Sequence, residues 1–245
     1  MRPRAAIVLF GRVGPEPKPL GLDPAGSHRL TRALLAATLD TLAPFTDRAR
    51  LVLALDGAPD AALWRFIAEH PSVIVLPQHG HGFEARLIGA LARARDLGFE
   101  RLVVVGSDVP TLARRDLDAA LAPGAGWVIG PAVDGGVYLL GLPAAELDRL
   151  AGLPWRRPTL GAALQARLAD RAPRLLTRRR DVDDLWDVAA LRRPLERLCG
   201  GPLRRRHTPS EDRPRRVLGR HAIAHSAPST LPPEMPRPPP RLAVA

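Results

Sequence analysis

The chain alternates between short, continuous apolar runs and longer stretches in which apolar residues recur at helical spacing. An apolar run without internal alternation is typical of a strand buried on both faces, and such strands occur mainly in parallel sheets covered by helices. Seven runs fit this pattern, at residues 5–10, 50–56, 72–77, 101–108, 127–131, 137–142 and 173–179. The alternation therefore predicts a three-layer α/β/α sandwich with a mostly parallel sheet.

Helices are expected between these strands. One should begin with Ser27 as its N-cap and present Leu30 through Leu42 on one face. Another should start near Phe83 and end before Gly98, since glycine commonly follows the last turn of a helix. Further helices are expected at residues 60–69, 113–121, 144–151, 160–169 and 184–198.

The positive charge is concentrated at one end of the sequence. Residues 200–245 hold nine arginines, three acidic residues and ten of the 27 prolines, so they contribute +6 of the net charge of +11. This segment has no sustained apolar period and cannot bury enough surface to offset the entropy of ordering it. We expect a globular domain at 1–199, a disordered Pro/Arg-rich tail at 200–245 and no nucleic-acid partner.

Two further observations exclude classes of protein. Cys199 is the only cysteine, which rules out an intrachain disulfide, and no Cys/His group has the spacing of zinc ligands. The apolar run Ala5–Phe10 is too short for a signal-peptide core or a membrane span. We therefore expect a cytoplasmic protein without a membrane span.

Ligands of parallel sheets bind at the carboxyl ends of the strands, which directs attention to the loops there. The first such loop, residues 11–21, is rich in Gly and Pro. Its glycine spacing does not match a dinucleotide fingerprint, and it lacks the Gly-Lys-Ser/Thr of a Walker A loop. If the loop binds a nucleotide, its backbone at Gly11 and the cations Arg12 and Lys18 are the candidate ligands. The alternative is an ordinary surface loop stiffened by prolines.

Carboxylates follow three of the other predicted strands. Asp108 ends the most hydrophobic strand and can hold Mg²⁺ or Mn²⁺, although a turn-capping role explains it equally well. Asp134 precedes Gly135 and Gly136, which permit either a close approach of a ligand or a plain hairpin turn. Asp183 is a candidate second metal ligand; alternatively, Asp181 or Asp183 caps the following helix.

In this order and spacing the loops resemble a known family. The segments GSDVPTL, GPAVDGGVYLLGL, LPWRRPTLG and RDVDDLWDV are similar to those of bacterial nucleotide-diphospho-sugar transferases of the radical-SAM/selenodomain-associated type. The resemblance spans roughly residues 5–190. It implies a glycosyltransferase-A-like fold, related to the enzymes that guanylylate phospholactate or the molybdenum cofactor.

The resemblance also implies roles for individual residues. Gly11, Arg12 and Lys18 would contact the nucleotide, Asp108 would bind Mg²⁺ or Mn²⁺, and Asp183 would be a second ligand. Asp134, with Asp108, would serve catalysis. In addition, Gly135 and Gly136 would face the sugar or acceptor.

The expected function is metal-dependent transfer of a glycosyl group from a nucleoside-diphosphate sugar to a small-molecule acceptor. One alternative is nucleotidyl transfer, in which an NTP is attacked at its α-phosphate and pyrophosphate leaves. Another is a nucleotide-binding protein without turnover, because the first loop reads EPKPLGL where the family has a Lys-Thr-Arg core. The segment WRRPT differs as well, since family members usually carry Trp-Ser-Thr there.

Overall fold

The computed structural model describes residues 4–13 and 18–204. The chain divides into a unit of residues 1–207 and a second of residues 208–245, and every described residue belongs to the first. The expected disordered tail lies outside the described residues from Arg205 onward, so its state and the domain boundary stay predictions.

Seven strands form one sheet in the order β3-β2-β1-β4-β6-β5-β7. All strands run in one direction except β6, which is antiparallel to both of its neighbours. The predicted mostly parallel sheet is therefore confirmed. The strands are β1 (Ala5–Arg12), β2 (Arg50–Asp56), β3 (Ile74–Pro77), β4 (Arg101–Gly106), β5 (Val128–Pro131), β6 (Val137–Pro143) and β7 (Arg174–Leu175).

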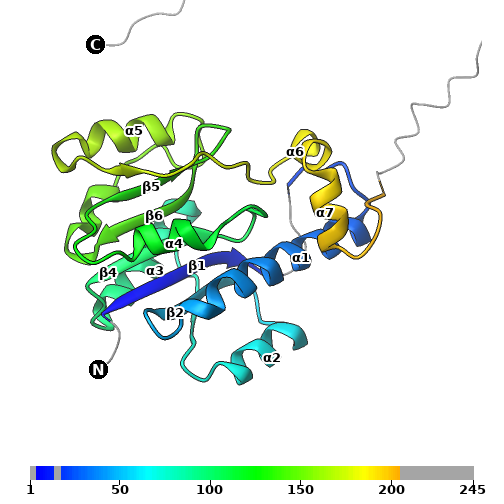
Figure 1. Cartoon of the computed structure of the whole chain (residues 1–245), viewed down its shortest axis with the longest axis horizontal. Coiled ribbons are helices and arrows are strands. Elements are labelled where there is room, and N and C mark those ends of the chain that lie inside the picture. The colour runs from blue at the N-terminus through cyan, green and yellow to red at the C-terminus, as the bar shows by residue number, and fades with distance from the viewer. Residues whose placement is uncertain (1–3, 14–17, 205–245) are drawn as a thin grey trace, which may run out of the picture. The chain divides into compact units, whose positions relative to one another are not determined.

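Helices cover both faces of the sheet (Figure 1). One face packs against α3 (Gly82–Asp96), the 3₁₀ segment η2 (Ala144–Leu150) and α5 (Leu160–Arg167). The other face packs against α1 (Pro24–Leu42), η1 (Ala43–Phe45), α2 (Ala61–Glu69) and α4 (Arg114–Ala120). The central strands are buried from both sides, as their continuous apolar sequences require.

A smaller apolar cluster joins the beginning of α1 to the last helices, α6 (Leu185–Ala190) and α7 (Arg192–Leu198). Leu30 and Leu34 of α1 pack there with Val188, Leu195 and Leu203. Because Leu203 is only 3% exposed, the packed part of the chain reaches beyond α7. The remaining short element is η3 (Ala169–Arg171).

Two predicted helix boundaries are wrong. Helix α1 begins three residues before Ser27, because Asp23 is the N-cap, its carboxylate accepts a hydrogen bond from the Gly26 amide at 2.6 Å, and Pro24 suits the first turn. The helix expected at 184–198 is two helices that meet at Leu191. Pro194 explains the break, since it has no N–H to donate to a preceding turn.

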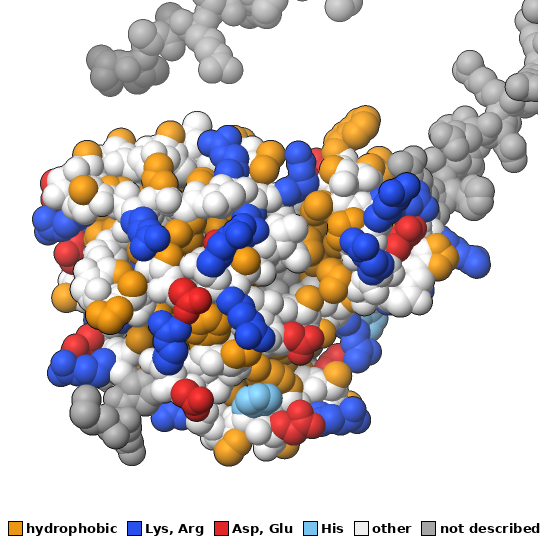
Figure 2. Space-filling model, viewed as in Figure 1, with side chains coloured by type: hydrophobic (Ala, Val, Ile, Leu, Met, Phe, Trp, Pro, Cys, Tyr) orange, Lys and Arg blue, Asp and Glu red, His pale blue; other side chains and the backbone are white. Residues whose placement is uncertain are grey.

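The surface carries its charges in a mixed arrangement. On the face shown in Figure 2, basic side chains are dispersed among acidic and apolar ones and form no continuous basic stripe. Among the helices of the described residues, none combines the length and hydropathy needed to span a bilayer.

Candidate functional site

A cavity of about 670 Å³ opens beside the carboxyl ends of β1 and β4. Its wall includes residues from every loop that the sequence singled out. A volume of this size suits a small-molecule ligand. The charged residues of the wall are Lys18, Asp108, Asp134, Asp181, Asp183, Arg156 and Arg157.

Lys18 joins two of the loops through its ammonium group. Its Nζ lies 2.6 Å from the Oδ2 of Asp108 and 2.6 Å from the Oδ1 of Asp183, and it also donates to the Val182 carbonyl at 3.1 Å. Burial by itself lowers the pKa of Lys18, but the two carboxylates outweigh burial and raise the pKa above its ordinary value. The lysine is therefore a fixed positive charge inside the cavity.

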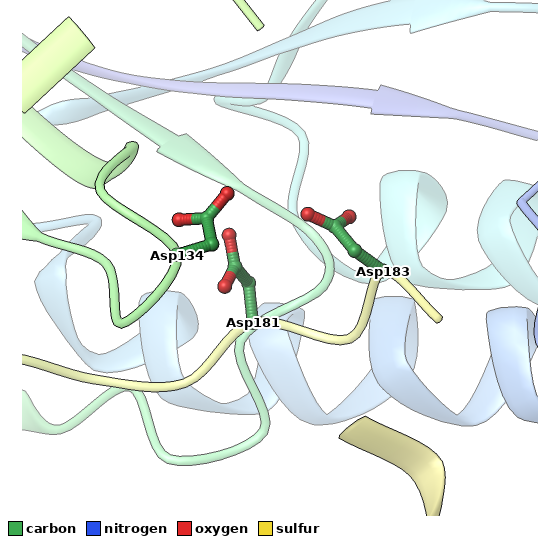
Figure 3. Close-up of side chains that lie close together, drawn as sticks. All are labelled: Asp134, Asp181 and Asp183. Atoms are coloured by element: carbon green, nitrogen blue, oxygen red, sulfur yellow. The ribbon is translucent and has the colours of Figure 1, made fainter. Parts of the chain in front are cut away.

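Three carboxylates gather next to this lysine. Asp134, Asp181 and Asp183 each offer an oxygen, and these oxygens lie within 4.8 Å of one another (Figure 3). Burial, followed by the neighbouring charges of Asp183, Asp134 and Asp108, raises the pKa of Asp181 to about 7. Burial also raises the pKa of Asp183, although Lys18 opposes that shift. A cluster of hard oxygen donors under mutual repulsion fits a divalent cation such as Mg²⁺ or Mn²⁺.

The turn between β5 and β6 orients Asp134. Its Oδ1 accepts a hydrogen bond from the Gly136 amide at 2.8 Å, and Gly135 between them has φ +93°. A Cβ at Gly135 would lie 2.0 Å from the Pro158 carbonyl oxygen, so only glycine fits there. The Gly161 amide donates to the Gly135 carbonyl at 2.9 Å, which holds the segment before α5 against the turn.

The segment after β7 brings Asp181 and Asp183 to the cavity. The Arg179 amide donates to the Pro131 carbonyl at 3.1 Å, and the Arg179 carbonyl accepts from the Val133 amide at 2.9 Å. Arg179 is itself fixed by a buried ion pair with Asp116, in which Nε lies 2.6 Å from Oδ2. Further on, the Val182 amide donates to the Asp108 carbonyl at 2.9 Å.

Some predicted site residues lie elsewhere. Arg12 forms an ion pair with Asp56 at the end of β2, at 2.7 Å, and neither Arg12 nor Gly11 lines the cavity. The Gly11 carbonyl accepts a hydrogen bond from Gln78 at 2.9 Å. Residues 14–17 of the same loop lie outside the described residues. The roles of Gly11 and Arg12 in nucleotide binding stay predictions.

The structure separates Asp108 from the other three carboxylates of the cavity, which the sequence did not predict. Asp108 lines the cavity but stands outside the three-carboxylate cluster, whereas Asp181 belongs to it. The cap of α6 is Asp184, whose carboxylate accepts from the amides of Trp186 and Asp187, so capping by Asp181 or Asp183 is wrong. The D-x-D spacing could have indicated Asp181, because alternate residues of an extended segment face the same side.

Aromatic residues form a second part of the wall. Phe10, Phe83 and Trp155 all line the cavity. The Phe10 and Phe83 rings are 5.5 Å apart and nearly perpendicular, and the Phe83 and Trp155 rings are 5.9 Å apart. Sequence reasoning missed this wall, since its members come from β1, α3 and the segment before α5.

Comparisons with known proteins agree with this picture. Residues 38–157 match the model of a family described as "Uncharacterized protein conserved in bacteria (DUF2064)". A solved structure from Desulfovibrio desulfuricans G20, named provisionally as a nucleotide-diphospho-sugar transferase, is similar with 25% identity and a TM-score of 0.66. The similarity covers 77% of this chain and 86% of that one. The resemblance inferred from the loops is thereby confirmed.

A more distant structure shares the fold. A nucleotidyl transferase from Methanothermobacter is similar with 18% identity and a TM-score of 0.53, over 79% of this chain and 97% of that one. No curated protein matches the chain.

Proposed function

Residues 38–157 of this chain belong to the conserved bacterial family DUF2064, and from this premise we propose that the protein is a metal-dependent glycosyltransferase. Its donor is a nucleoside-diphosphate sugar and its acceptor a small molecule with a hydroxyl group. One observation carries the proposal: Lys18 and the carboxylates of three loops line a single cavity at the ligand-binding edge of the sheet. The similarity to the D. desulfuricans protein supports this class of donor.

Positive charge at the cavity serves the leaving group. In glycosyl transfer the bond between the anomeric carbon and the diphosphate breaks, and the negative charge on the departing diphosphate grows. Lys18 is held at that position by Asp108, Asp183 and the Val182 carbonyl, which accept all three of its N–H groups, so a phosphate oxygen that binds the ammonium group would replace one of these partners. Asp181 and Asp183, with the Asp134 carboxylate beside them, would hold Mg²⁺ or Mn²⁺, which would add Lewis-acid stabilisation of the same charge.

Asp134 is the candidate for orienting the acceptor. Its Oδ1 is engaged by the Gly136 amide, which fixes the carboxylate and leaves its second oxygen available. That oxygen accepts the proton of the attacking hydroxyl while the acceptor oxygen forms a bond to the anomeric carbon. Gly136, which also lines the cavity, lets the sugar or acceptor approach the backbone.

The test identifies which leaving group the reaction releases. The protein is incubated with Mn²⁺ or Mg²⁺ and panels of nucleoside-diphosphate sugars and NTPs, and release of nucleoside diphosphate and pyrophosphate is measured. Release of the diphosphate with sugar transfer is expected. Pyrophosphate release instead would establish nucleotidyl transfer, and nucleotide binding without either product would establish a binding protein without turnover.

A variant pair ties the activity to the carboxylate cluster. Asp183→Asn should abolish stabilisation of the fold by Mn²⁺ with nucleotide, as followed by thermal unfolding. Asp148→Asn is the matched control, because Asp148 is exposed in η2 and does not line the cavity. Equal stabilisation of both variants would remove Asp183 from the metal site.

A further inference from the structure

We propose that Arg156, Arg157 and Trp155 form a subsite for an anionic group, a carboxylate or a phosphate, on the acceptor. The inference rests on the proposed function, because it names the chemical class of the second substrate of the same cavity. It goes further in assigning that substrate a negative charge and in naming the residues that select it.

The position of these residues assigns them to the acceptor. All three line the cavity, and they belong to the segment that leads into α5. This segment is fixed to the turn that carries Asp134, since Gly161 donates to the Gly135 carbonyl and the Pro158 carbonyl fills the space beside Gly135. The carboxylate proposed to take the acceptor proton and the two arginines are therefore held on one wall.

The guanidinium groups of Arg156 and Arg157 have no polar partner among the described residues. Within residues 4–13 and 18–204, neither Arg156 nor Arg157 makes a side-chain hydrogen bond or an ion pair, and both are exposed. Nearby arginines are engaged differently: Arg149 binds Asp170, and Arg180 binds Asp187. A guanidinium presents its N–H donors in a planar fork that matches carboxylate and phosphate oxygens. Two such groups on a cavity wall fit an anionic ligand.

The backbone at Arg156 supports a functional role. Arg156 has φ +60°, in the left-handed region that favours glycine, and apart from glycines only Ala172 shares a positive φ among the described residues. A side chain in this region costs about 1–2 kcal/mol. Both arginines line the cavity, so this unfavourable backbone conformation lies at the candidate site, where strained residues often occur.

Trp155 supplies an unsatisfied donor beside the arginines. Its indole Nε1 is buried and has no hydrogen-bond partner among the described residues. A buried donor without a partner is unfavourable, so the N–H group of this cavity-lining residue should respond to an oxyanion that binds beside it. Together with the Phe83 ring, Trp155 forms an apolar surface next to the cations. The subsite therefore favours an oxyanion carried on a compact carbon skeleton.

The first experiment measures anion binding without any donor. Glycerol, glycerate and glycerol 3-phosphate share hydroxyl groups and differ in charge, so they are titrated at constant ionic strength while the indole N–H signal of Trp155 is followed by NMR. Trp155→Phe identifies that signal. Both anions should shift the signal, and glycerol should not. No shift with either anion, or an equal shift with glycerol, would overturn the subsite.

Variants of Arg156 and Arg157 then test whether these arginines bind the anion. The double variant Arg156→Gln/Arg157→Gln should weaken binding of both anions at least about tenfold, because each lost charged hydrogen bond is worth that much or more. Arg193→Gln, an exposed residue of α7 that does not line the cavity, should bind like the unaltered chain. Arg156→Gly should raise the melting temperature while weakening anion binding, which excludes a folding defect. Unchanged binding in the double variant would refute the assignment.

Donor binding separates this inference from the proposed function. Affinity for nucleoside-diphosphate sugars with Mn²⁺ is measured for the unaltered chain and for the double variant. Absence of donor binding in the unaltered chain contradicts the proposed function, and the anion titration still decides the subsite. An equal loss of donor and anion affinity in the double variant would mean that the arginines bind the donor diphosphate, which overturns the acceptor assignment.

Discussion

Lys18 is the only lysine in the chain, and its ammonium group lies between two carboxylates of the cavity. Lysine labelled with ¹³C or ¹⁵N therefore gives one side-chain signal, which reports on the candidate site without interference. A cation that binds Asp183 competes with Lys18 for the same carboxylate. The signal of Lys18 should consequently move when Mn²⁺ or its diamagnetic substitute Mg²⁺ is added.

Replacing this lysine should have opposite effects on metal and nucleotide. Lys18→Met removes the charge that neutralises Asp108 and Asp183, so we expect a loss of about 1–3 kcal/mol in the free energy of unfolding without metal. Mg²⁺ should bind more tightly, since it no longer competes with the ammonium group, and nucleotide should bind at least about tenfold more weakly. Calorimetric titrations of each ligand check both effects. Weaker binding of Mg²⁺ would contradict the competition.

Asp181 predicts a dependence of stability on pH. In the folded unit its pKa is raised to about 7, whereas an unfolded chain restores the ordinary value of 3.8. The folded state therefore holds more protons between these values, and the contribution of Asp181 to the free energy of unfolding falls as pH rises from about 4 to about 7. Above that range the contribution is constant.

Urea unfolding in EDTA from pH 5 to pH 8 measures this effect. The difference in stability between the Asp181→Asn variant and the unaltered chain should grow with pH up to about 7, in favour of the variant. Asp148→Asn serves as the exposed control. A constant difference across the range would show that Asp181 ionises normally.

At the scale of single residues, the sequence indicated which side chains reach the cavity but not how they pair. Lys18, Asp108, Asp134 and Asp183 all line it. The partner of Arg12, by contrast, depends on the parallel register that sets Arg12 beside Asp56 on the neighbouring strand. Registers between distant strands are not visible in local sequence patterns, so this ion pair could not be predicted.

At the scale of elements, the buried ion pair of Arg179 and Asp116 connects α4 to the segment after β7. The side chains are 8% and 3% exposed, so loss of one partner leaves the other charge buried without compensation. Arg179→Met should cost about 3–5 kcal/mol of unfolding free energy, and the double variant with Asp116→Leu should recover much of that loss. Chemical denaturation of the single and double variants measures the coupling. Additive effects would contradict it.

The elements themselves were largely predictable, because the sheet is built from strands that are apolar on both faces. The first four predicted strands and the β5–β6 pair correspond to observed ones with small shifts at their ends. The last strand does not reach its expected length: β7 spans Arg174–Leu175, and the chain returns to the sheet only at a single bridge between Ala132 and Arg179. A run of arginines lacks the apolar surface that would hold a longer strand in the sheet.

At the scale of the whole molecule, the two units of the chain should be separable. A chain ending at His207 should unfold at the same urea midpoint as the full chain, since it keeps every described residue, including Leu203 of the cluster beneath α7. A chain ending at Gly201 is the matched control, because it lacks Leu203 of the cluster beneath α7 and should lose about 2–3 kcal/mol. A lower midpoint for the first truncation would show that the tail contributes to folding.

The antiparallel β6 has a consequence for how the protein folds. It is inserted between β4 and β5, and the cavity draws on residues from Phe10 to Asp183, nearly the full length of the described unit. No fragment and no partly folded intermediate can contain a complete binding site. A ligand that occupies this cavity therefore recognises only the fully formed unit, and it should slow proteolysis along the entire sheet rather than near its own contacts.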